Sequence, residues 1–547
     1  MSQVSSDGQT YIILKEGTER SRGKDARDTN IQAAQIVAEV VKSSLGPKGM
    51  DKMLVDSFGD ITITNDGATM LKEMDIQHPA AKMMVEVSKT QDDEVGDGTT
   101  SVVILTGELL GKAVELMSKK IHPTVVIDGY RDAMEQALKV LEEIALHVDP
   151  KDKEVLKKVA VTSMASKLVS GYSDYIADLA VDAILQIAEE ADDGIEVDLD
   201  MVKIEKKPGG SITDSSLVWG LIIDKEAVHD DMPKLVNEAR IGLLDSAMEI
   251  EKTEFSAKIQ IDTPEEIQAY LDHEERTLRE LVEKVKDAGI NVLFCQKGID
   301  DMVQHFLARE GILAALRVKK SDMEKLARAT GGNIVSTIKD LQKADLGLAG
   351  KVEQFKIGDD DNILISEAKN PRSVTILIRG GSKYITDEAE RSIHDALCVV
   401  RNAIEDGKIV AGGGASEVEI AMELRHLAES TGGREQLAIE KFADAMEVIP
   451  KILAENAVID AIDILTEIRT KHSTKGNSTF GLDLFKGKVT DLEKAGVIEP
   501  LRIKSQAIRS AAEAAELILR IDDVIAAKSK PGGMPGGMPG GMPPGMM

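Results

Sequence analysis

Three glycine-rich segments of the chain combine residue types that suit the binding of a phosphate group. They read Leu45-Gly46-Pro47-Lys48-Gly49, Gly96-Asp97-Gly98-Thr99-Thr100 and Ala411-Gly412-Gly413-Gly414. Glycine lets the backbone come close to a ligand, and the flanking patterns predict a helix end beside each segment. Helix ends carry unpaired backbone groups, and the N–H groups at a helix start attract anions. These segments are therefore candidate phosphate-binding elements.

The middle segment also carries side chains that suit a metal-bound phosphate. The carboxylate of Asp97 is a ligand type that magnesium prefers, and the hydroxyls of Thr99 and Thr100 can donate hydrogen bonds. For each segment taken alone, an ordinary turn with a helix cap is the commoner structure. The chain contains no GxxxxGK[ST] motif and no GxGxxG motif within a strand–helix unit. The sequence therefore supports neither a P-loop nor a dinucleotide-binding fold.

Taken together and in this order, the segments resemble the nucleotide site of the chaperonins. The resemblance includes Thr64-Asn65-Asp66-Gly67-Ala68-Thr69 and residues 391–397, and it runs over essentially the whole chain. It is to the group II type, which comprises the archaeal thermosome and its eukaryotic cytosolic relatives of the TCP-1 family. The resemblance implies ATP and Mg²⁺ as cofactors, and an ATPase activity that drives the folding of non-native proteins.

The resemblance also implies a role for individual residues. Asp97 would bind magnesium, and Asp66 and Asp395 would position and activate the attacking water. Lys167 would sense the γ-phosphate, a contact that suits a flexible ammonium group. Further nucleotide contacts are implied for Leu45, Gly46, Pro47, Gly96, Gly98, Thr99, Thr100, Gly412 and Gly413 and, facing the adenosine, for Gly481, Asp483 and Glu499. Glu499, which precedes Pro500, also fits a plain loop carboxylate.

Helical patterns at both ends of the chain must position these segments. Apolar residues recur at helical spacing from Ile31 to Leu45 and stop at Gly46-Pro47, a pair that ends helices. Two short strands are predicted next, and helical patterns then continue to about Ala145. Helices are predicted again from Ala415 to Ala527, with a strand-like interruption. The three predicted strand regions are Met53–Val55, Ile61–Thr64 and Gly481–Val489.

Between these helical ends the sequence predicts an α/β region. Its clearest strands are Ile241–Leu244, Val292–Phe294, Ile312–Leu316 and Val374–Ile378. A long helix follows from Tyr384 to about Asp406. On that helix Ile385, Ala389, Ile393, Ala396 and Val400 form the predicted buried stripe, whereas Glu388, Arg391, Ser392 and Asp395 face elsewhere. A solvated helix face is the simple interpretation of the second group.

An α/β region between two helical ends predicts a domain inserted into another. By resemblance the fold is multi-domain, with a mainly α-helical equatorial ATP-binding domain, a small α/β intermediate hinge domain and an α/β apical substrate-binding domain. The implied boundaries are 1–150 with 410–528, 151–220 with 375–409, and 221–374. Residues 529–547, rich in Gly, Met and Pro, predict a disordered tail.

The resemblance also implies a helical protrusion at about residues 253–286 that would act as a built-in lid, so no separate co-chaperonin is expected. Ile259 and Ile261 predict an extended stretch, and Thr263-Pro264-Glu265-Glu266 predicts a helix start. The helix then carries the apolar residues Ile267, Leu271, Leu278, Leu281 and Val285. On pattern alone, a plain surface helix is the favoured interpretation. Helices near 299–310 and 321–330 carry Met302, Val303, Phe306 and Leu307, which suit core packing or contact with unfolded clients.

The composition limits the partners and the compartment. The 547 residues include 67 Lys and Arg against 95 Asp and Glu, a net charge of −28 that repels nucleic acid and anionic lipid. The two cysteines, Cys295 and Cys398, form no CxxC motif or Cys/His cluster. No stretch reaches about 18 uninterrupted apolar residues, and residues 1–15 do not resemble an export signal. We therefore expect a cytoplasmic protein without nucleic-acid or membrane partners.

The leading hypothesis is a subunit of a folding chamber made of two stacked rings of identical or paralogous subunits. Its other partners would be unfolded proteins. A stand-alone ATP-dependent small-molecule kinase or hydrolase is the alternative, and it predicts a monomer or dimer with its own substrate pocket. A passive holdase without turnover is a third hypothesis, which Asp66, Asp97 and Asp395 argue against because they are catalytic residue types.

Overall fold

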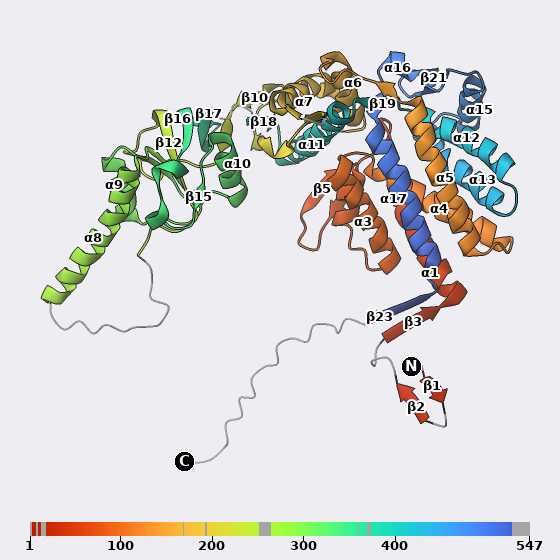
Figure 1. Ribbon diagram of the computed structural model, residues 1–547, viewed down its shortest axis with the longest axis horizontal. Helices are drawn as coiled ribbons and strands as arrows, with labels where there is room; N and C mark the ends of the chain where they lie inside the picture. Colours follow the sequence, from red (N-terminus) through yellow and green to blue (C-terminus); the bar gives the residue numbers. More distant parts are fainter. Residues whose placement is uncertain are drawn as a thin grey trace.

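The chain forms three packed units in a row, which Figure 1 shows from right to left as a base unit, a middle unit and an outer unit. This computed structural model describes residues 3–6, 9–12, 18–167, 169–191, 194–250, 264–358, 360–368 and 373–527. The predicted extended stretch at Ile259 and Ile261, the residue Thr263 and the predicted tail at 529–547 lie outside the described residues.

The base unit is a helical bundle built from both ends of the chain. One apolar core joins residues 31–141 to residues 410–519. Helix α4 (Thr99–Ser118) lies inside the bundle, where its nearly continuous apolar sequence is buried. No helix among the described residues, α4 included, is long and apolar enough to cross a membrane. The other helices are α1 (Gly23–Lys42), α2 (Gly67–Glu73), α3 (Pro79–Val95), α5 (Pro123–Ile144), α12 (Ala415–Thr431), α13 (Glu435–Met446), α14 (Val448–Asn456), α15 (Ala461–His472), α16 (Leu492–Ala495) and α17 (Leu501–Arg520).

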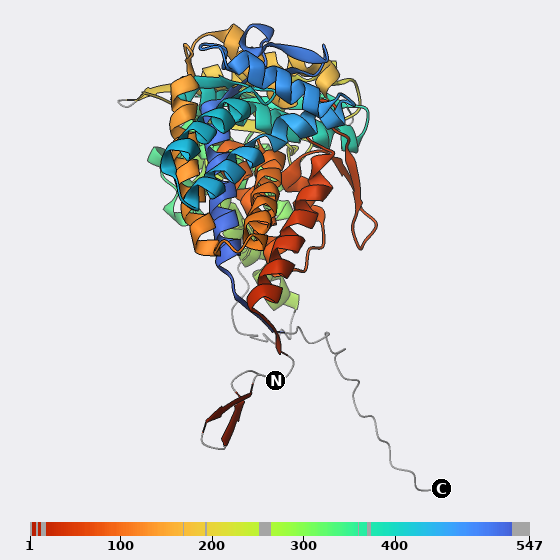
Figure 2. The same ribbon diagram turned by 90° about the vertical axis from the view of Figure 1, so that its right-hand side faces the viewer.

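Small sheets surround this bundle. The predicted strands appear as β4 (Lys52–Val55), β5 (Ile61–Thr64), β20 (Phe480–Asp483) and β21 (Lys488–Asp491). Strands β4 and β5 form a hairpin that stands out from the helices at the right of Figure 2. A three-stranded sheet joins β6 (Leu146–His147), β19 (Lys408–Ala411) and β22 (Ile498–Pro500). A separate hairpin pairs β1 (Gln3–Ser6) with β2 (Gln9–Ile12).

The prediction that the helical region continues to Ala527 is wrong for its last residues. Helix α17 stops at Arg520, and β23 (Asp523–Ala527) pairs antiparallel with β3 (Thr18–Arg22). The β-branched residues Val524 and Ile525 favour a strand once a partner strand is available. That partner comes from the other end of the chain, so a local pattern cannot reveal it.

The middle unit packs three helices against a three-stranded sheet. Its helices are α6 (Lys153–Met164), α7 (Ser173–Ile187) and α11 (Lys383–Asp406), and its sheet has the order β10 (Ser216–Trp219), β18 (Val374–Gly380), β9 (Val202–Pro208). The hairpin of β7 (Glu189–Ala191) and β8 (Gly194–Glu196) lies in the same part of the chain. Helix α11 confirms the long helix predicted from Tyr384. It begins at the cap Ser382, whose hydroxyl accepts a hydrogen bond from the N–H of Ile385.

The second face of α11 is not the solvated face that the sequence suggested. Glu388, Ser392 and Asp395 are all buried. The reason is that the base unit covers this face: the guanidinium of Arg391 donates to the carbonyl of Ile63 at 3.2 Å. The helix is therefore enclosed by the middle unit on one side and by the base unit on the other.

The outer unit is an α/β domain around a mixed sheet. Its strand order is β11 (Leu221–Ile223), β17 (Asp360–Ala368), β16 (Gly347–Ile357), β12 (Leu235–Leu244), β13 (Val292–Cys295), β14 (Leu313–Ala315), with β15 (Ile334–Val335) also paired to β12. Strand β13 is buried along its whole length, as its continuous apolar sequence predicts. The predicted strands of this region are confirmed, although β18 belongs to the sheet of the middle unit.

The helices of the outer unit are α8 (Pro264–Ala288), α9 (Asp301–Arg309) and α10 (Lys320–Thr330). Helix α8 begins at Pro264 as predicted and projects away from the sheet in Figure 1. Leu278 and Val285 are buried in its second half, whereas Leu271 is exposed in its first half. On α9, Val303 and Leu307 are core residues, and Met302 is exposed.

Replacing Phe442 by alanine tests the packing of the base core. Phe442 is buried against Tyr130, with ring centroids 5.5 Å apart in an edge-to-face arrangement. We expect Phe442→Ala to lower the free energy of unfolding by about 3 to 5 kcal/mol, because it leaves a cavity in the core. Urea unfolding followed by circular dichroism measures this. Leu437→Ala, an exposed position on the same helix, is the control, and an equal effect of both changes would contradict the described core.

Candidate functional site

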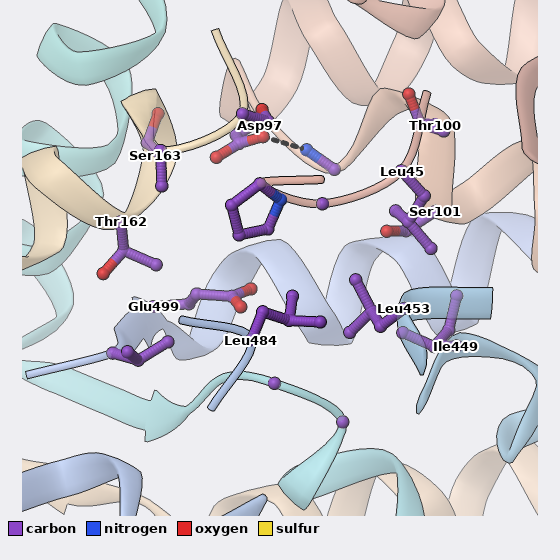
Figure 3. Close-up of a pocket in the computed structure, with 18 of the residues that line it drawn as sticks. Leu45, Asp97, Thr100, Ser101, Thr162, Ser163, Ile449, Leu453, Leu484 and Glu499 are labelled. Atoms are coloured by element: carbon purple, nitrogen blue, oxygen red, sulfur yellow. Dashed lines mark hydrogen bonds between the residues drawn. The ribbon is translucent and has the colours of Figure 1, made fainter. Parts of the chain in front are cut away.

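A cavity of about 430 Å³ lies where the base unit meets the middle unit. Figure 3 shows it, with Asp97 and Ser163 near one end and the apolar side chains of Leu45, Ile449 and Leu453 near the other. Segments far apart in the sequence form its walls. The sequence-predicted residues that line it are Leu45, Gly46, Pro47, Asp66, Asp97, Gly98, Thr99, Thr100, Lys167, Asp395, Gly413, Asp483 and Glu499.

Three of the predicted glycines lie behind the wall of the cavity instead of in it. A Cβ atom at Gly96 would meet the Cβ of Cys398 at 2.2 Å, and one at Gly412 would meet Oε1 of Glu499 at 2.7 Å. A Cβ atom at Gly481 would lie 2.7 Å from Leu492. These glycines allow close packing that sets the position of the wall, so the structure gives them a structural role.

Two helix starts converge at the polar end of the cavity. Helix α4 begins at Thr99 after Gly98, which has a φ of 79° that favours glycine. Helix α2 begins beside it, and a Cβ atom at Gly67 would lie only 2.7 Å from the backbone nitrogen of Thr100. The first N–H groups of α4 have no acceptor within the helix. They and the helix dipole make this end of the cavity suitable for an anion such as a phosphate.

The carboxylate of Asp97 faces this end of the cavity. Its Oδ1 accepts a hydrogen bond from the N–H of Gly98 at 2.6 Å (Figure 3). Burial raises the pKa of Asp97, and the positive charge of Lys167 opposes that shift only in part. The structure thus presents one carboxylate at the place where the helix start would hold a phosphate.

The residues around Asp97 fit a magnesium ion that arrives together with phosphate. Among the described residues, no group of three or more His, Cys, Asp or Glu side chains is placed to hold a metal. Magnesium commonly takes one or two protein carboxylates and completes its shell with phosphate oxygens and water. In the cavity wall, the buried Oδ1 of Asn65 has no hydrogen-bond partner in the part of the chain that the structure describes, so it is a free acceptor for a metal-bound water.

Asp66 is held as an ionised acceptor. Its carboxylate accepts hydrogen bonds from the hydroxyl of Thr99 at 2.8 Å and from the N–H of Thr69 at 2.7 Å. Burial by itself would raise the pKa of Asp66. The charge of Lys167 and these hydrogen bonds outweigh burial and hold the pKa below its usual value. Asp66 therefore carries a negative charge at neutral pH.

Lys167 and Asp395 form a buried ion pair beside Asp66. Their side chains are 6% and 9% exposed, and the ammonium group of Lys167 donates to a carboxylate oxygen of Asp395. Lys167 follows α6 and Asp395 lies on α11, so the middle unit supplies both groups. A second cavity of about 250 Å³ shares Asp66 and Asp395 with the first. It is also lined by Asp92, whose pKa is raised to about 6 by burial and by the nearby charge of Asp66.

The other end of the main cavity is mostly apolar. Elsewhere its wall also carries the apolar side chains of Leu482, Leu484, Phe485 and Val497. The carboxylate of Asp483 makes most of its contacts within its own turn. It accepts hydrogen bonds from the N–H groups of Phe485 and Lys486 and forms an ion pair with the Lys486 ammonium group at 2.7 Å. A flat aromatic ring suits a wall of this kind.

Sequence reasoning missed several residues of the site. Asn65, Thr162, Ser163, Ile449, Leu453 and Lys504 line the cavity without being predicted. Asn65 lies within the motif Thr64-Asn65-Asp66-Gly67-Ala68-Thr69, and Ser163 lies four residues before Lys167, so their positions are a signal that could have identified them. Leu453 and Lys504 lie on ordinary amphipathic helices, where no spacing distinguishes a cavity residue from a core or surface residue.

Gly67→Ala tests the approach of α2 to the start of α4. The added Cβ atom would push α2 away from the backbone nitrogen of Thr100, so we expect magnesium-ATP to bind about tenfold more weakly or worse. Calorimetric titration with ATP and magnesium measures the affinity. Gly171→Ala is the control, because a Cβ atom there meets nothing within 4 Å. Unchanged affinity in Gly67→Ala would rule out the start of α4 as the phosphate-binding element.

Comparisons with known proteins identify the family. Residues 37–529 match the model of the TCP-1/cpn60 chaperonin family. A thermosome subunit of Methanopyrus kandleri is 56% identical over 96% of this chain and 97% of the relative. The thermosome subunit beta of Thermococcus kodakarensis is 55% identical over 97% of this chain and 98% of the relative. The solved open-state monomer of a group II chaperonin from Methanococcoides burtonii is 43% identical, with a TM-score of 0.62 over 78% of this chain and 100% of that chain. The chain therefore belongs to the TCP-1/cpn60 chaperonin family, in its group II branch.

Proposed function

We propose that this chain is a subunit of a double-ring, ATP-dependent protein-folding chaperonin that binds and hydrolyses ATP in the 430 Å³ cavity. The observation that carries the proposal is the meeting of Asp66, Asp97, Lys167 and Asp395 around the start of α4. The base unit then acts as the equatorial ATP-binding domain, the middle unit as the intermediate hinge domain and the outer unit as the apical substrate-binding domain.

In the proposed mechanism the start of α4 and the hydroxyls of Thr99 and Thr100 hold the phosphates, and the apolar end holds the base. Asp97 would hold a magnesium ion, which when bound would neutralise charge that develops on the phosphates. Asp66 and Asp395 orient the water that attacks the γ-phosphorus, and one of the two carboxylates accepts a proton from that water. ADP leaves as its bond to the γ-phosphorus breaks. The low pKa of Asp66 keeps that acceptor ionised at neutral pH.

The buried pair of Lys167 and Asp395 links nucleotide binding to the middle unit. A γ-phosphate in the cavity competes with Asp395 for the ammonium group of Lys167. The exchange frees the Asp395 carboxylate for the attacking water and changes the contact between α11 and the base unit. Hydrolysis then depends on the arrangement of both units and not on the base unit alone.

The proposed particle is a cytoplasmic assembly of identical or paralogous subunits that encloses unfolded proteins. The β4–β5 hairpin supports contact with a second copy, because it exposes the apolar residues Met53, Val55 and Phe58. An isolated two-stranded hairpin is marginally stable in water, and an exposed apolar one invites a partner. Helix α8, which projects from the outer unit, serves as the built-in lid, so no separate co-chaperonin is needed.

Asp395→Asn tests the proposed hydrolysis. We expect ATP turnover to fall about 100-fold or more, with little change in ATP affinity, because the amide cannot accept the proton of the water. Steady-state phosphate release and equilibrium ATP binding measure the two quantities on the same particle. Asp387→Asn, on the same helix but paired with Lys206, should keep turnover. Full turnover in Asp395→Asn would remove this residue from the reaction.

Phe58→Asp tests the proposed assembly. The side chain of Phe58 is 91% exposed in the single subunit. A charge there would be buried against the next subunit, so we expect the concentration needed for assembly to rise about tenfold or more. Sedimentation velocity measures this, with Leu348→Asp in the outer unit as the control. A wild-type chain that hydrolyses ATP as a monomer or dimer would favour the stand-alone kinase or hydrolase instead.

A further inference from the structure

A histidine lies beside the carboxylate of Asp395. The two oxygens of this carboxylate have different neighbours: Oδ2 accepts a hydrogen bond from the ammonium group of Lys167, and Oδ1 lies 3.9 Å from Nδ1 of His394. Asp395 is buried, whereas the side chain of His394 is 55% exposed. The imidazole therefore stands between a buried carboxylate of the proposed reaction site and the solvent.

The second cavity, of about 250 Å³, brings the two residues together. Its wall includes Asp66, Asp92, His394 and Asp395. A separation of 3.9 Å is too long for a direct hydrogen bond between Nδ1 and Oδ1. A cavity of this size with several polar groups in its wall has room and partners for water. A water molecule in the second cavity can thus join the Asp395 carboxylate to the imidazole.

The surroundings of His394 favour the neutral form of its ring. Partial burial lowers the pKa of His394, and the positive charges of Lys167 and Arg401 lower it further. The negative charges of Glu390 and Asp66 oppose this shift without outweighing it. A neutral imidazole has one nitrogen that accepts a proton and another that can release one. His394 is therefore able to pass on a proton at neutral pH.

Other titratable groups also surround this imidazole. Sγ of Cys398 lies 3.8 Å from Nδ1, but burial raises the pKa of the thiol to about 11, so it stays protonated. The charges of Lys206 and Arg391 are already engaged in ion pairs. Asp92, with a pKa of about 6, also lines the second cavity and is the competing proton acceptor. Asp92 is less exposed than His394, which favours the histidine as the group that releases a proton to the solvent.

Hydrolysis produces a proton that must leave this buried site. The oxygen of the attacking water forms a bond to the γ-phosphorus, and the bond from the γ-phosphorus to ADP breaks with its electron pair remaining on ADP. One proton of the water passes to a carboxylate, and the other stays on the phosphate product. Because Asp395 is buried, a proton on its carboxylate needs a path to the solvent before the next turnover.

We propose that His394 is a proton-relay residue, which takes the proton from Asp395 through water in the second cavity and passes it to the solvent. The inference rests on the proposed function, because it requires hydrolysis at Asp395. His394 acts through Asp395 and not on the nucleotide. Its loss should therefore lower turnover and leave the binding of ATP unchanged.

The test measures ATP turnover of the assembled full-length chain in the wild type and in His394→Ala. We expect kcat to fall about tenfold or more with an unchanged KM, because the relay has lost its proton acceptor. Added imidazole should restore turnover in His394→Ala, since this base fits the space that the side chain leaves. Pyrazole, a ring of the same size that is far less basic, should not restore it. His426→Ala, which removes an exposed histidine of α12, is the matched control and should keep wild-type turnover without a response to imidazole.

The outcomes separate this inference from the proposed function. Full turnover in His394→Ala, or a loss that imidazole restores no better than pyrazole, overturns the inference and leaves the ATPase intact. A loss in Asp92→Asn together with full turnover in His394→Ala would assign the relay to Asp92 instead. Absence of ATP turnover in the wild type overturns the proposed function itself. If His394→Ala does not assemble, His394→Gln, which is polar but not basic, is measured in its place, and wild-type turnover in that variant overturns the inference as well.

Discussion

Several carboxylates share one cavity, and the need to balance their charges organises the site around it. Asp66, Asp97, Asp395 and Glu499 line the same space, and each is at least partly removed from water. Like charges in a poorly solvated space repel one another strongly. Lys167 supplies a positive charge at Asp395, Lys504 supplies one at Glu499, and the start of α4 supplies a partial positive charge beside Asp97. The positions of these three positive groups decide where a polyphosphate and a metal ion can be held.

Hydrogen bonds around the cavity join the two ends of the chain in the base unit. The side-chain amide of Gln91 donates to the carbonyls of Asp97 and Ile503, and that of Asn456 donates to the carbonyl of Leu45. The bond from Gln91 to Ile503 and the bond from Asn456 to Leu45 each tie a segment of the first 150 residues to one of the last 150. The cavity is complete only when the two ends have folded together, and the middle unit then closes it by adding Lys167 and Asp395.

Buried charge also marks the junction of the middle unit with the outer unit. The ammonium group of Lys203 in β9 lies 2.8 Å from Asp322 of α10 and donates to the carbonyl of Ile222 at 2.7 Å. A buried charge that loses its partner is costly in free energy. A movement of the outer unit must therefore either keep this ion pair or give each charge another partner. A buried lysine thus lies at each of the two junctions, Lys167 near the Asp66 carboxylate of the base unit and Lys203 beside Asp322 of the outer unit. An exchange of partners at either lysine would alter the contact between two units.

By itself the sequence determined the family, the helical ends, the α/β insertion and the aspartates that line the cavity, because periodicity and glycine-rich motifs are local properties. Asp66, Asp97, Thr99 and Lys167 could be named because their motifs are short and continuous. Only the tertiary structure decided that β23 pairs with β3, that the second face of α11 is buried, and that Gly96, Gly412 and Gly481 lie behind the wall. It also revealed Lys504, whose partners Glu417 and Glu499 lie elsewhere in the chain. The physical reason is that burial, strand pairing and charge balance are set by residues distant in sequence, and no local pattern contains them.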